Sequence, residues 1–203
     1  MKLYIKPGAC SLASHIALRE VGATFDIEKV DTKAQKTESG EDYSKINPNG
    51  YVPALRLDDG QVLSEGAALL QYIADQHPQS KLAPAPGTIE RTRLQQYLNF
   101  IASGLHQAFG PFFGPSLSDE ARSAAEARVA KKLSYMESLL ADGRSYLLGD
   151  SFSVADAYLF VVSNWSNFVG IDLGKWPKLA AFVERVAQRD ATQAAMRAEG
   201  LSA

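Results

Sequence analysis

The strongest constraint on the fold is a change of pattern midway along the chain. Residues 1–77 alternate short strand-like and helix-like segments, whereas the chain from about residue 88 onward reads as successive amphipathic helices. The segment between them is typical of a linker because it contains Pro78, Pro84, Pro86 and Gly87. We therefore predict an α/β plus all-α protein with two domains, residues 1–80 and residues 87–203.

The first half predicts a small mixed sheet with helices packed on it. A strand at residues 2–5 is followed by a helix that ends at Gly22, and a second strand covers residues 25–30. Residues 54–57 and 61–63 flank an Asp-Gly turn and therefore predict a hairpin. The order is βαβ, a helical link and then ββα. The βαβ unit makes parallel strands, and the hairpin adds an antiparallel one.

The second half predicts a helical bundle. One apolar stripe on a long helix is formed by Leu94, Leu98, Ile101 and Leu105, and another by Val129, Leu133, Met136 and Leu140. Ser153 and Asp156 are spaced as a capping box, in which each side chain bonds the backbone N–H of the other residue. Helices from about Pro177 and Thr192 are expected to finish the chain.

Composition excludes several functional classes. The chain of 203 residues is 46% hydrophobic and 22% charged, as packed globular proteins are, and its formal net charge of -2 gives no broad attraction to nucleic acid. Its longest apolar run, residues 157–162, is far shorter than the ~20 residues that span a bilayer, and its N-terminus lacks a signal-peptide core. The histidines are too widely separated to suggest a zinc site. We expect a cytoplasmic protein with no metal and no nucleic-acid or membrane partner.

Cys10, the single cysteine, lies between the first predicted strand and the first predicted helix. The N–H groups at a helix start carry partial positive charge, so we expect the pKa of this thiol to fall. An inert buried filler is the commoner role for a lone cysteine, but this junction favours a reactive one. The chain holds no resolving thiol, so disulfide exchange needs a thiol from solution. Glutathione is the obvious cytosolic candidate.

Two further segments carry weaker signals. Ser64, Glu65 and Gly66 are predicted to open a helix, with Ser64 as its cap. Such a helix start can receive a carboxylate, and Glu65 can pair with an amine, which suits the γ-glutamyl end of glutathione. Helix capping alone remains an open alternative. At Val52-Pro53 the local sequence favours a trans peptide bond.

A series of short motifs runs through the chain in a fixed order. They are Lys2-Leu-Tyr, Pro7-Gly8-Ala-Cys10-Ser-Leu, Lys36-Thr-Glu-Ser-Gly40, Asn47-Pro48, Gly50-Tyr-Val-Pro53, Leu63-Ser-Glu-Gly66, Leu98-Asn-Phe-Ile with His106, Tyr146-Leu-Leu-Gly-Asp150, Ser153-Val-Ala-Asp156 and Ala198-Glu-Gly-Leu201. In this order the chain resembles the bacterial beta-class glutathione S-transferases over essentially its full length. The resemblance implies an N-terminal thioredoxin-like domain that binds glutathione, a C-terminal helical-bundle domain with the co-substrate site and dimer contacts, and a homodimer.

The resemblance also implies an activity and a site. Glutathione thiolate would be conjugated to a hydrophobic electrophile, the peptide bond before Pro53 would be cis, and Cys10 could hold glutathione as a mixed disulfide. The implied catalytic residues are Cys10, Ser11 and His106. The implied glutathione-binding residues are Cys10, Gln35, Tyr51, Val52, Glu65, Gly66, Asn99, Ser103, Gly104 and His106.

The chain departs from the family pattern at two positions. Gln35 stands where many members have lysine, so it can donate a hydrogen bond but cannot neutralise the glycyl carboxylate of glutathione; Lys33 or Lys36 could compensate. Ile5 stands at a frequent aromatic position, while Tyr4 remains and stays a candidate for stabilising the thiolate.

Helical spacing independently supports His106. Seven residues separate it from Asn99, nearly two helical turns, so both are predicted on one face. An inert histidine at a domain seam is the alternative. Candidate walls of the co-substrate pocket are Phe109, Phe112, Phe113 and Trp165, although each one singly is more often a core residue. A glutathione-dependent thiol–disulfide oxidoreductase and a non-enzymatic ligand carrier remain alternative functions.

Overall fold

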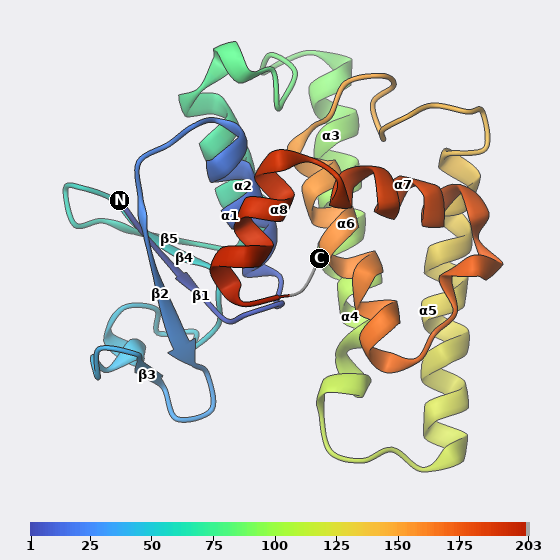
Figure 1. The fold of residues 1–203 in the computed structure, drawn as a ribbon, viewed down its shortest axis with the longest axis horizontal. Helices are drawn as coiled ribbons and strands as arrows, with labels where there is room; N and C mark the ends of the chain where they lie inside the picture. The colour runs from blue at the N-terminus through green and yellow to red at the C-terminus, as the bar shows by residue number, and fades with distance from the viewer. Residues whose placement is uncertain (202–203) are drawn as a thin grey trace. The chain divides into compact units, whose positions relative to one another are not determined.

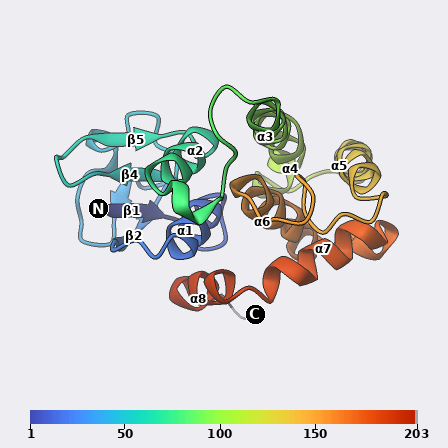
Figure 2. The same cartoon turned by 90° about the horizontal axis from the view of Figure 1, so that it is seen from above.

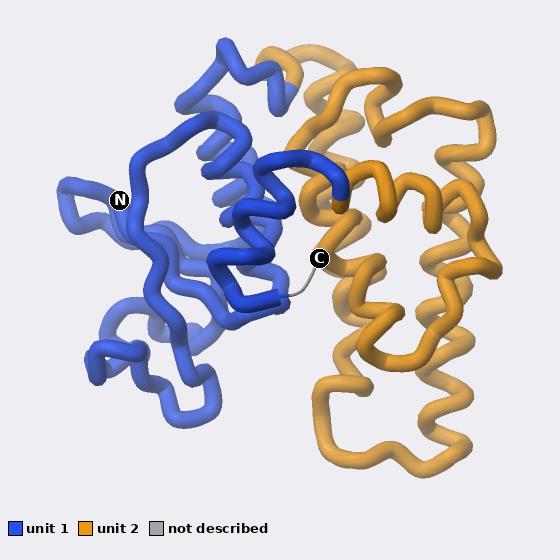
Figure 3. The backbone as a smooth tube through the Cα atoms, in the orientation of Figure 1, with its two compact units in different colours: residues 1–83, 188–203 blue, residues 84–187 orange. Residues whose placement is uncertain are grey.

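The structure is a computed structural model that describes residues 1–201 (Figure 1). It divides into two compact units, which Figure 3 distinguishes by colour. Unit 1 comprises residues 1–83 and the C-terminal segment that begins at Gln188. Unit 2 comprises residues 84–187.

Unit 1 is built on a five-stranded mixed sheet in the order β3-β2-β1-β4-β5 (Figures 1 and 2). Its strands are β1 (Lys2–Ile5), β2 (Asp26–Asp31), β3 (Lys36–Thr37), β4 (Ala54–Arg56) and β5 (Val62–Ser64). β1 and β2 are parallel, and every other neighbouring pair is antiparallel. The helices of the unit are α1 (Ser11–Glu20), α2 (Gly66–Gln76) and α8 (Asp190–Glu199).

This arrangement confirms the predicted βαβ-link-ββα order and the thioredoxin-like fold class. The helical link is a single 3-10 turn at Tyr43–Lys45, where Asp42 accepts a hydrogen bond from the Ser44 N–H. The short edge strand β3 was not predicted, because two residues are too few to show an alternating pattern.

Both faces of the central strand β1 are buried. Tyr4 packs in a cluster with Tyr43 and Val52 on the face covered by the segment between β3 and β4. Leu3 and Ile5 point to the opposite face because side chains alternate along a strand, and both are fully buried. The sheet is therefore a rigid support for the loops at its ends.

The last helix, α8, packs against α1 in unit 1. Its Glu199 is buried and lies 2.9 Å from Nδ1 of the buried His15, while its second carboxylate oxygen accepts the Gly8 N–H at 3.0 Å. Near the start of α8, Arg189 makes an ion pair with Glu20 at 2.6 Å. The predicted domain of residues 87–203 includes this helix, which packs in unit 1 instead, because helical periodicity does not say which partner a helix packs on.

Unit 2 is entirely helical. Its α-helices are α3 (Ile89–Phe100), α4 (Gln107–Phe109), α5 (Asp119–Leu139), α6 (Val154–Val169) and α7 (Pro177–Ala187). α6 is buried along most of its length and contacts α3 and α7. The single long helix expected from the first apolar stripe is instead interrupted between α3 and α4 by a π-helical segment, Ile101–His106. Among residues 1–201, no helix combines the length and the apolar character that crossing a bilayer requires.

The predicted capping box at the start of α6 is confirmed. The fully buried Asp156 carboxylate accepts the Ser153 N–H at 2.8 Å and the Ser153 hydroxyl at 2.6 Å. It also accepts the Leu147 N–H at 2.8 Å, which ties the preceding loop to the helix. One carboxylate therefore satisfies three donors that burial would otherwise leave unpaired.

Asp156→Ala should lower the free energy of unfolding by about 3 kcal/mol, because the variant leaves buried donors without acceptors. Urea unfolding measures the change. Asp119→Ala is the matched control, since Asp119 is an exposed acidic residue in the first turn of α5 and its loss should cost far less. Equal losses in the two variants would contradict the assignment.

Candidate glutathione-binding site

Cys10 lies where the sequence placed it, at the end of the β1–α1 loop as the N-cap residue of α1. Its side chain is a free thiol and is half-buried. The sulfur donates a hydrogen bond to the Val52 carbonyl at 3.3 Å. The thiol therefore faces the loop that precedes β4 and is not sealed inside an apolar core.

The expected fall in the pKa of Cys10 is wrong. Burial raises the pKa of this thiol to about 11, and the nearby Glu65 carboxylate pushes it in the same direction. The backbone N–H groups of Cys10 and Ser11 lower the pKa, as the helix start predicts, but they are outweighed by desolvation. At neutral pH, Cys10 is thus a thiol that donates to Val52.

Ser11 contributes through its backbone and not through its hydroxyl. The side chain is fully buried, and its Oγ interacts with Lys6, accepting from the N–H at 3.2 Å and lying 3.3 Å from the carbonyl. Its backbone N–H is one of the groups that stabilise charge on the Cys10 sulfur. Ser11 therefore shapes the β1–α1 loop.

The peptide bond between Val52 and Pro53 is cis, as the resemblance implies and against the local preference. Val52 is buried, whereas the neighbouring Tyr51 side chain is 73% exposed. Within residues 1–201, the Val52 N–H has no hydrogen-bond partner. The backbone of Val52 therefore lies beside the Cys10 sulfur and keeps its N–H free to donate a hydrogen bond. We call this stretch the backbone edge at Val52.

Gln35 lies beside the same loop but already has partners. Its Nε2 donates to the Thr32 carbonyl at 2.6 Å and to the Gly50 carbonyl at 3.1 Å. Gly50 has φ +71°, and a Cβ there would lie 2.8 Å from this amide nitrogen, so the position requires glycine. Gln35 therefore holds the loop in place, while Lys33 and Lys36 are exposed nearby in sequence.

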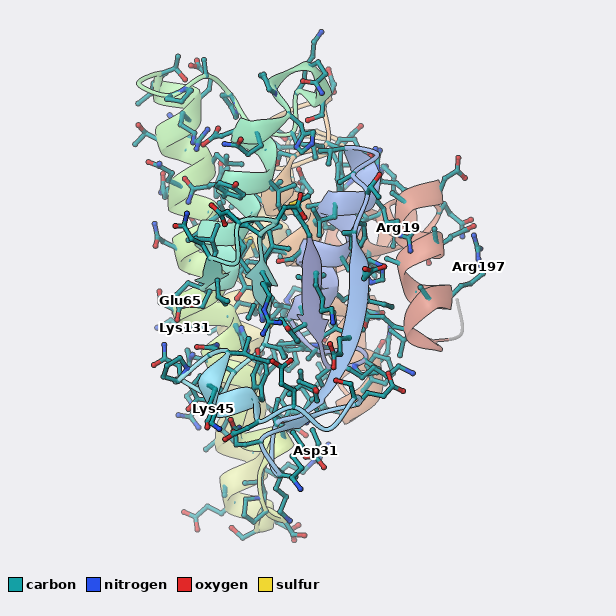
Figure 4. The ribbon with its side chains drawn as sticks, turned by 90° about the vertical axis from the view of Figure 1, so that its left-hand side faces the viewer. Arg19, Asp31, Lys45, Glu65, Lys131 and Arg197 are labelled. Carbon is teal, nitrogen blue, oxygen red and sulfur yellow. The ribbon has the colours of Figure 1, made fainter. Side chains whose placement is uncertain are left out.

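Glu65 and Gly66 open α2, but Ser64 is not the cap. Ser64 is the last residue of β5, and Glu65 is the N-cap residue with φ 66°, a conformation that is costly for a residue with a side chain. The Glu65 side chain is exposed (Figure 4). A Cβ built on Gly66 would lie 3.8 Å from Pro53, so this helix start adjoins the cis-proline loop.

The predicted site residues of unit 2 gather on and around the π-helical segment. Asn99 lies in the last turn of α3, and its carbonyl accepts the Ser103 hydroxyl at 2.8 Å. Ser103, Gly104 and His106 all belong to the segment. Because π-helical bonding adds a residue to the turn, the α-helical spacing that placed Asn99 and His106 on one face does not apply. Such single π-turns occur frequently at functional sites.

His106 is half-buried in an aromatic setting. Its Nδ1 lies 2.9 Å from the Tyr158 hydroxyl, and its ring meets Trp165 edge-on with centroids 4.8 Å apart. Burial lowers the pKa of His106, so the imidazole is neutral at pH 7. No partner for its Nε2 is found within residues 1–201, which leaves that nitrogen available to a ligand.

The four candidate wall residues differ in exposure. Phe109 is fully buried and packs on Trp165, so it belongs to the core. Phe113 is 56% exposed and meets the nearly buried Trp165 edge-on at 5.1 Å, while Phe112 is half-buried. Phe112 and Phe113 are the aromatic surfaces that remain open to a ligand.

Sequence reasoning missed Tyr43 and Asn47. The Tyr43 hydroxyl donates to the Tyr51 carbonyl at 2.8 Å, and Nδ2 of Asn47 donates to the same carbonyl at 2.7 Å. Tyr43 gave only the signal of an isolated aromatic residue in a polar stretch, while Asn47 belongs to the Asn47-Pro48 motif but was not assigned to the site. Tyr4, by contrast, is fully buried against Tyr43, and its hydroxyl has no partner among the described residues. Its ring belongs to the hydrophobic cluster that covers one face of the sheet.

Residues 1–201 contain no group of three or more His, Cys, Asp or Glu side chains that could hold a metal ion. The candidate site of unit 1 therefore consists of a thiol, a backbone edge and a helix start with an exposed carboxylate. This combination suits a small thiol compound that carries both an amine and a carboxylate.

Comparison with known proteins agrees with this geometry. The family described as "Glutathione S-transferase, N-terminal domain" matches residues 8–76, and "Glutathione S-transferase, C-terminal domain" matches residues 100–190. Glutathione S-transferase GstA of Escherichia coli O157:H7 is 45% identical over 99% of this chain and 100% of its own length.

Solved structures give the same result. The beta-class glutathione S-transferase of Sphingomonas chungbukensis is 51% identical and superimposes with a TM-score of 0.95, covering 100% of both chains. A sphingomonad glutathione S-transferase solved with glutathione is 52% identical, with a TM-score of 0.94 and coverage of 100% of both chains. The chain therefore belongs to the glutathione S-transferase family, and its predicted resemblance to the bacterial beta class is confirmed.

Proposed function

We propose that the chain conjugates glutathione to hydrophobic electrophiles, so that RX and glutathione give R-S-glutathione and HX. The observation that carries the proposal is the backbone edge at Val52, which lies beside the Cys10 thiol and the α2 helix start. The solved complex of a similar glutathione S-transferase with glutathione supports the identity of the thiol.

Groups in unit 1 suit two of the three residues of glutathione, the γ-glutamyl and the cysteinyl residue. The γ-glutamyl carboxylate suits the free N–H groups at the start of α2, where Gly66 allows close approach, and its amine suits the exposed Glu65. The cysteinyl backbone suits the edge at Val52, in the manner of an added strand. The exposed Tyr51 flanks this edge, so we assign it to the same site. We assign Gln35 to the site as the residue that holds the loop through its hydrogen bonds to the Thr32 and Gly50 carbonyls.

The reacting sulfur is that of glutathione and not that of Cys10. Its proton passes to solvent, its thiolate attacks the electrophilic carbon, and the X group departs with the bonding electron pair before it is protonated. The positive end of α1 stabilises the thiolate. The family resemblance implies that His106, Asn99, Ser103 and Gly104 lie near glutathione and its thiol. We assign them to glutathione binding, and we assign the neutral His106 also to catalysis at the sulfur.

Besides conjugation, we propose that the site carries out disulfide exchange through Cys10. Its thiolate attacks a mixed disulfide of glutathione, forms a disulfide with the glutathionyl half and releases the other half as a thiolate. A second glutathione thiolate then attacks this disulfide, which regenerates the Cys10 thiolate and releases glutathione disulfide. The high pKa of Cys10 makes this reaction slow at neutral pH in the free protein. We propose exchange as an additional activity of the same site.

We propose a cytoplasmic homodimer in which residues 1–80 bind glutathione and residues 87–203 supply the co-substrate site and the dimer contacts. Phe112 and Phe113, beside Trp165, offer aromatic surface to an apolar co-substrate. Light scattering of the purified protein measures the subunit number directly.

Cys10→Ala should separate the two chemistries. Conjugation of an aromatic halide should stay within about threefold of wild type, because the attacking sulfur belongs to glutathione. Exchange with a glutathione mixed disulfide should fall at least about 100-fold, because its nucleophile is gone. Side-by-side assays measure both rates. Equal and complete loss of both activities would contradict this division, and turnover of the disulfide alone in wild type would favour an oxidoreductase.

The alkylation rate of Cys10 in the free protein should rise about tenfold per pH unit from pH 7 to pH 10, because a thiol with a pKa of about 11 gains thiolate throughout this range. Mass spectrometry after timed iodoacetamide treatment gives the rate. Free glutathione is the control, since an ordinary thiol levels off near its pKa of about 8.5–9. A plateau for Cys10 below pH 8 would show a stabilised thiolate instead.

His106→Gln should lower kcat for conjugation about tenfold while KM for glutathione changes little, because a neutral imidazole would act on the sulfur and not on the rest of the tripeptide. His77→Gln is the matched control, since Nδ1 of His77 also lies 2.9 Å from a partner, the Ile73 carbonyl, at the end of α2. An unchanged kcat for His106→Gln would leave His106 as a structural residue.

A further inference from the structure

Three successive carbonyls before Pro53 each accept a hydrogen bond from a side chain elsewhere in unit 1. Gln35 Nε2 donates to the Gly50 carbonyl at 3.1 Å, and Cys10 Sγ donates to the Val52 carbonyl at 3.3 Å. The Tyr51 carbonyl between them accepts from Tyr43 Oη at 2.8 Å and from Asn47 Nδ2 at 2.7 Å. We call this set the carbonyl brace. It holds a segment that belongs to no helix or strand.

The middle carbonyl is the most firmly held. Tyr51 O receives two donors, and both Tyr43 and Asn47 are buried, at 0% and 4% exposure. Tyr43 is itself fixed, because its N–H donates to the Gln35 carbonyl at 2.9 Å and its ring packs on Tyr4. The phenol and the amide therefore hold the Tyr51 carbonyl in one direction.

Peptide planarity transmits that direction to Val52. The Tyr51 carbonyl and the Val52 N–H belong to one rigid peptide unit and point to opposite sides of it. Holding the carbonyl toward Tyr43 and Asn47 thus aims the Val52 N–H away from them. This N–H has no partner among the described residues, and it is the donor that the proposed site offers to glutathione.

We propose that Tyr43 is a positioning residue for glutathione, acting through the Tyr51–Val52 peptide unit. The inference rests on the proposed function, since it concerns the same backbone edge. Tyr43 does not touch the reacting atoms in this scheme. It fixes a donor that binds the cysteinyl carbonyl of glutathione equally in the ground state and in the transition state, so its loss should raise KM and leave kcat unchanged.

The role does not depend on ionisation. Burial raises the pKa of Tyr43 to about 12, so the phenol remains a neutral donor throughout the range in which conjugation is assayed. The effect of removing it should therefore be the same at pH 6.5 and pH 8.5. The titratable groups that act on Tyr43 are Tyr4 and Cys10, and both are protonated in this range.

Tyr43→Phe tests the proposal by removing one donor and keeping the ring. We expect KM for glutathione to rise about fivefold, the scale of one neutral hydrogen bond, with kcat within about twofold of wild type. Calorimetric titration with S-methylglutathione should show the same fivefold weakening in Kd. Steady-state kinetics at both pH values completes the measurement.

Tyr4→Phe is the matched control, because it removes a buried hydroxyl from the adjacent ring without removing a hydrogen bond that the described structure shows. Its KM should equal that of wild type. Asn47→Ala provides a second test if Tyr43→Phe folds poorly, since it removes the other donor to Tyr51 and should also raise KM about fivefold.

Two outcomes would overturn the inference while leaving the proposed function intact. One is an unchanged KM in both Tyr43→Phe and Asn47→Ala, and the other is a lower kcat with KM unchanged. Failure of wild-type protein to bind S-methylglutathione at all is a different result. It would overturn the proposed function and the inference together.

Discussion

The hydrogen bond from the Cys10 thiol to the Val52 carbonyl joins the two loops on which the site of unit 1 depends. One loop leads from β1 into α1, and the other leads through the cis-proline into β4. Neither loop belongs to a helix or strand, and side-chain hydrogen bonds add to the backbone turns that hold each of them. Glu199 of α8 accepts the Gly8 N–H of the first loop, and the carbonyl brace holds the second.

The electrostatics of Cys10 support the proposal that the sulfur of glutathione, and not that of Cys10, is the nucleophile in conjugation. A helix start favours an anion by about 1–2 kcal/mol at best, whereas burial can shift a pKa by several units in the opposite direction. Desolvation is the larger effect here, and the thiol stays protonated. A protonated Cys10 is a hydrogen-bond donor to the backbone. In the proposed function, the site orients the thiol of glutathione, and the protonated Cys10 does not compete with it as a nucleophile.

Much of the fold could be predicted because it follows from local pattern. The alternation at residues 25–30, the Asp-Gly hairpin and the capping box at Ser153 and Asp156 each depend on neighbours within a few residues, and the structure contains all three. The position of Cys10 at a strand-to-helix junction follows from the same reasoning. Family resemblance, and not local preference, predicted the cis bond before Pro53.

The features that were missed depend on contacts distant in sequence or on a balance of energies. The packing of α8 on α1 relies on the buried pair of His15 and Glu199, 184 residues apart. The π-helical segment at Ile101–His106 adds a residue without breaking the apolar stripe, so periodicity could not reveal it. The pKa of Cys10 depends on desolvation, which only the packed structure determines.

In the proposed function, glutathione occupies the backbone edge at Val52, directly beside the Cys10 sulfur. Protection of Cys10 from iodoacetamide by S-methylglutathione, which cannot itself be alkylated as a thiol, tests the claim most directly. If glutathione occupies this edge, the alkylation rate falls saturably, with a half-maximal concentration equal to the calorimetric Kd. An alkylation rate that stays constant while calorimetry shows the ligand fully bound would place glutathione elsewhere and contradict the account.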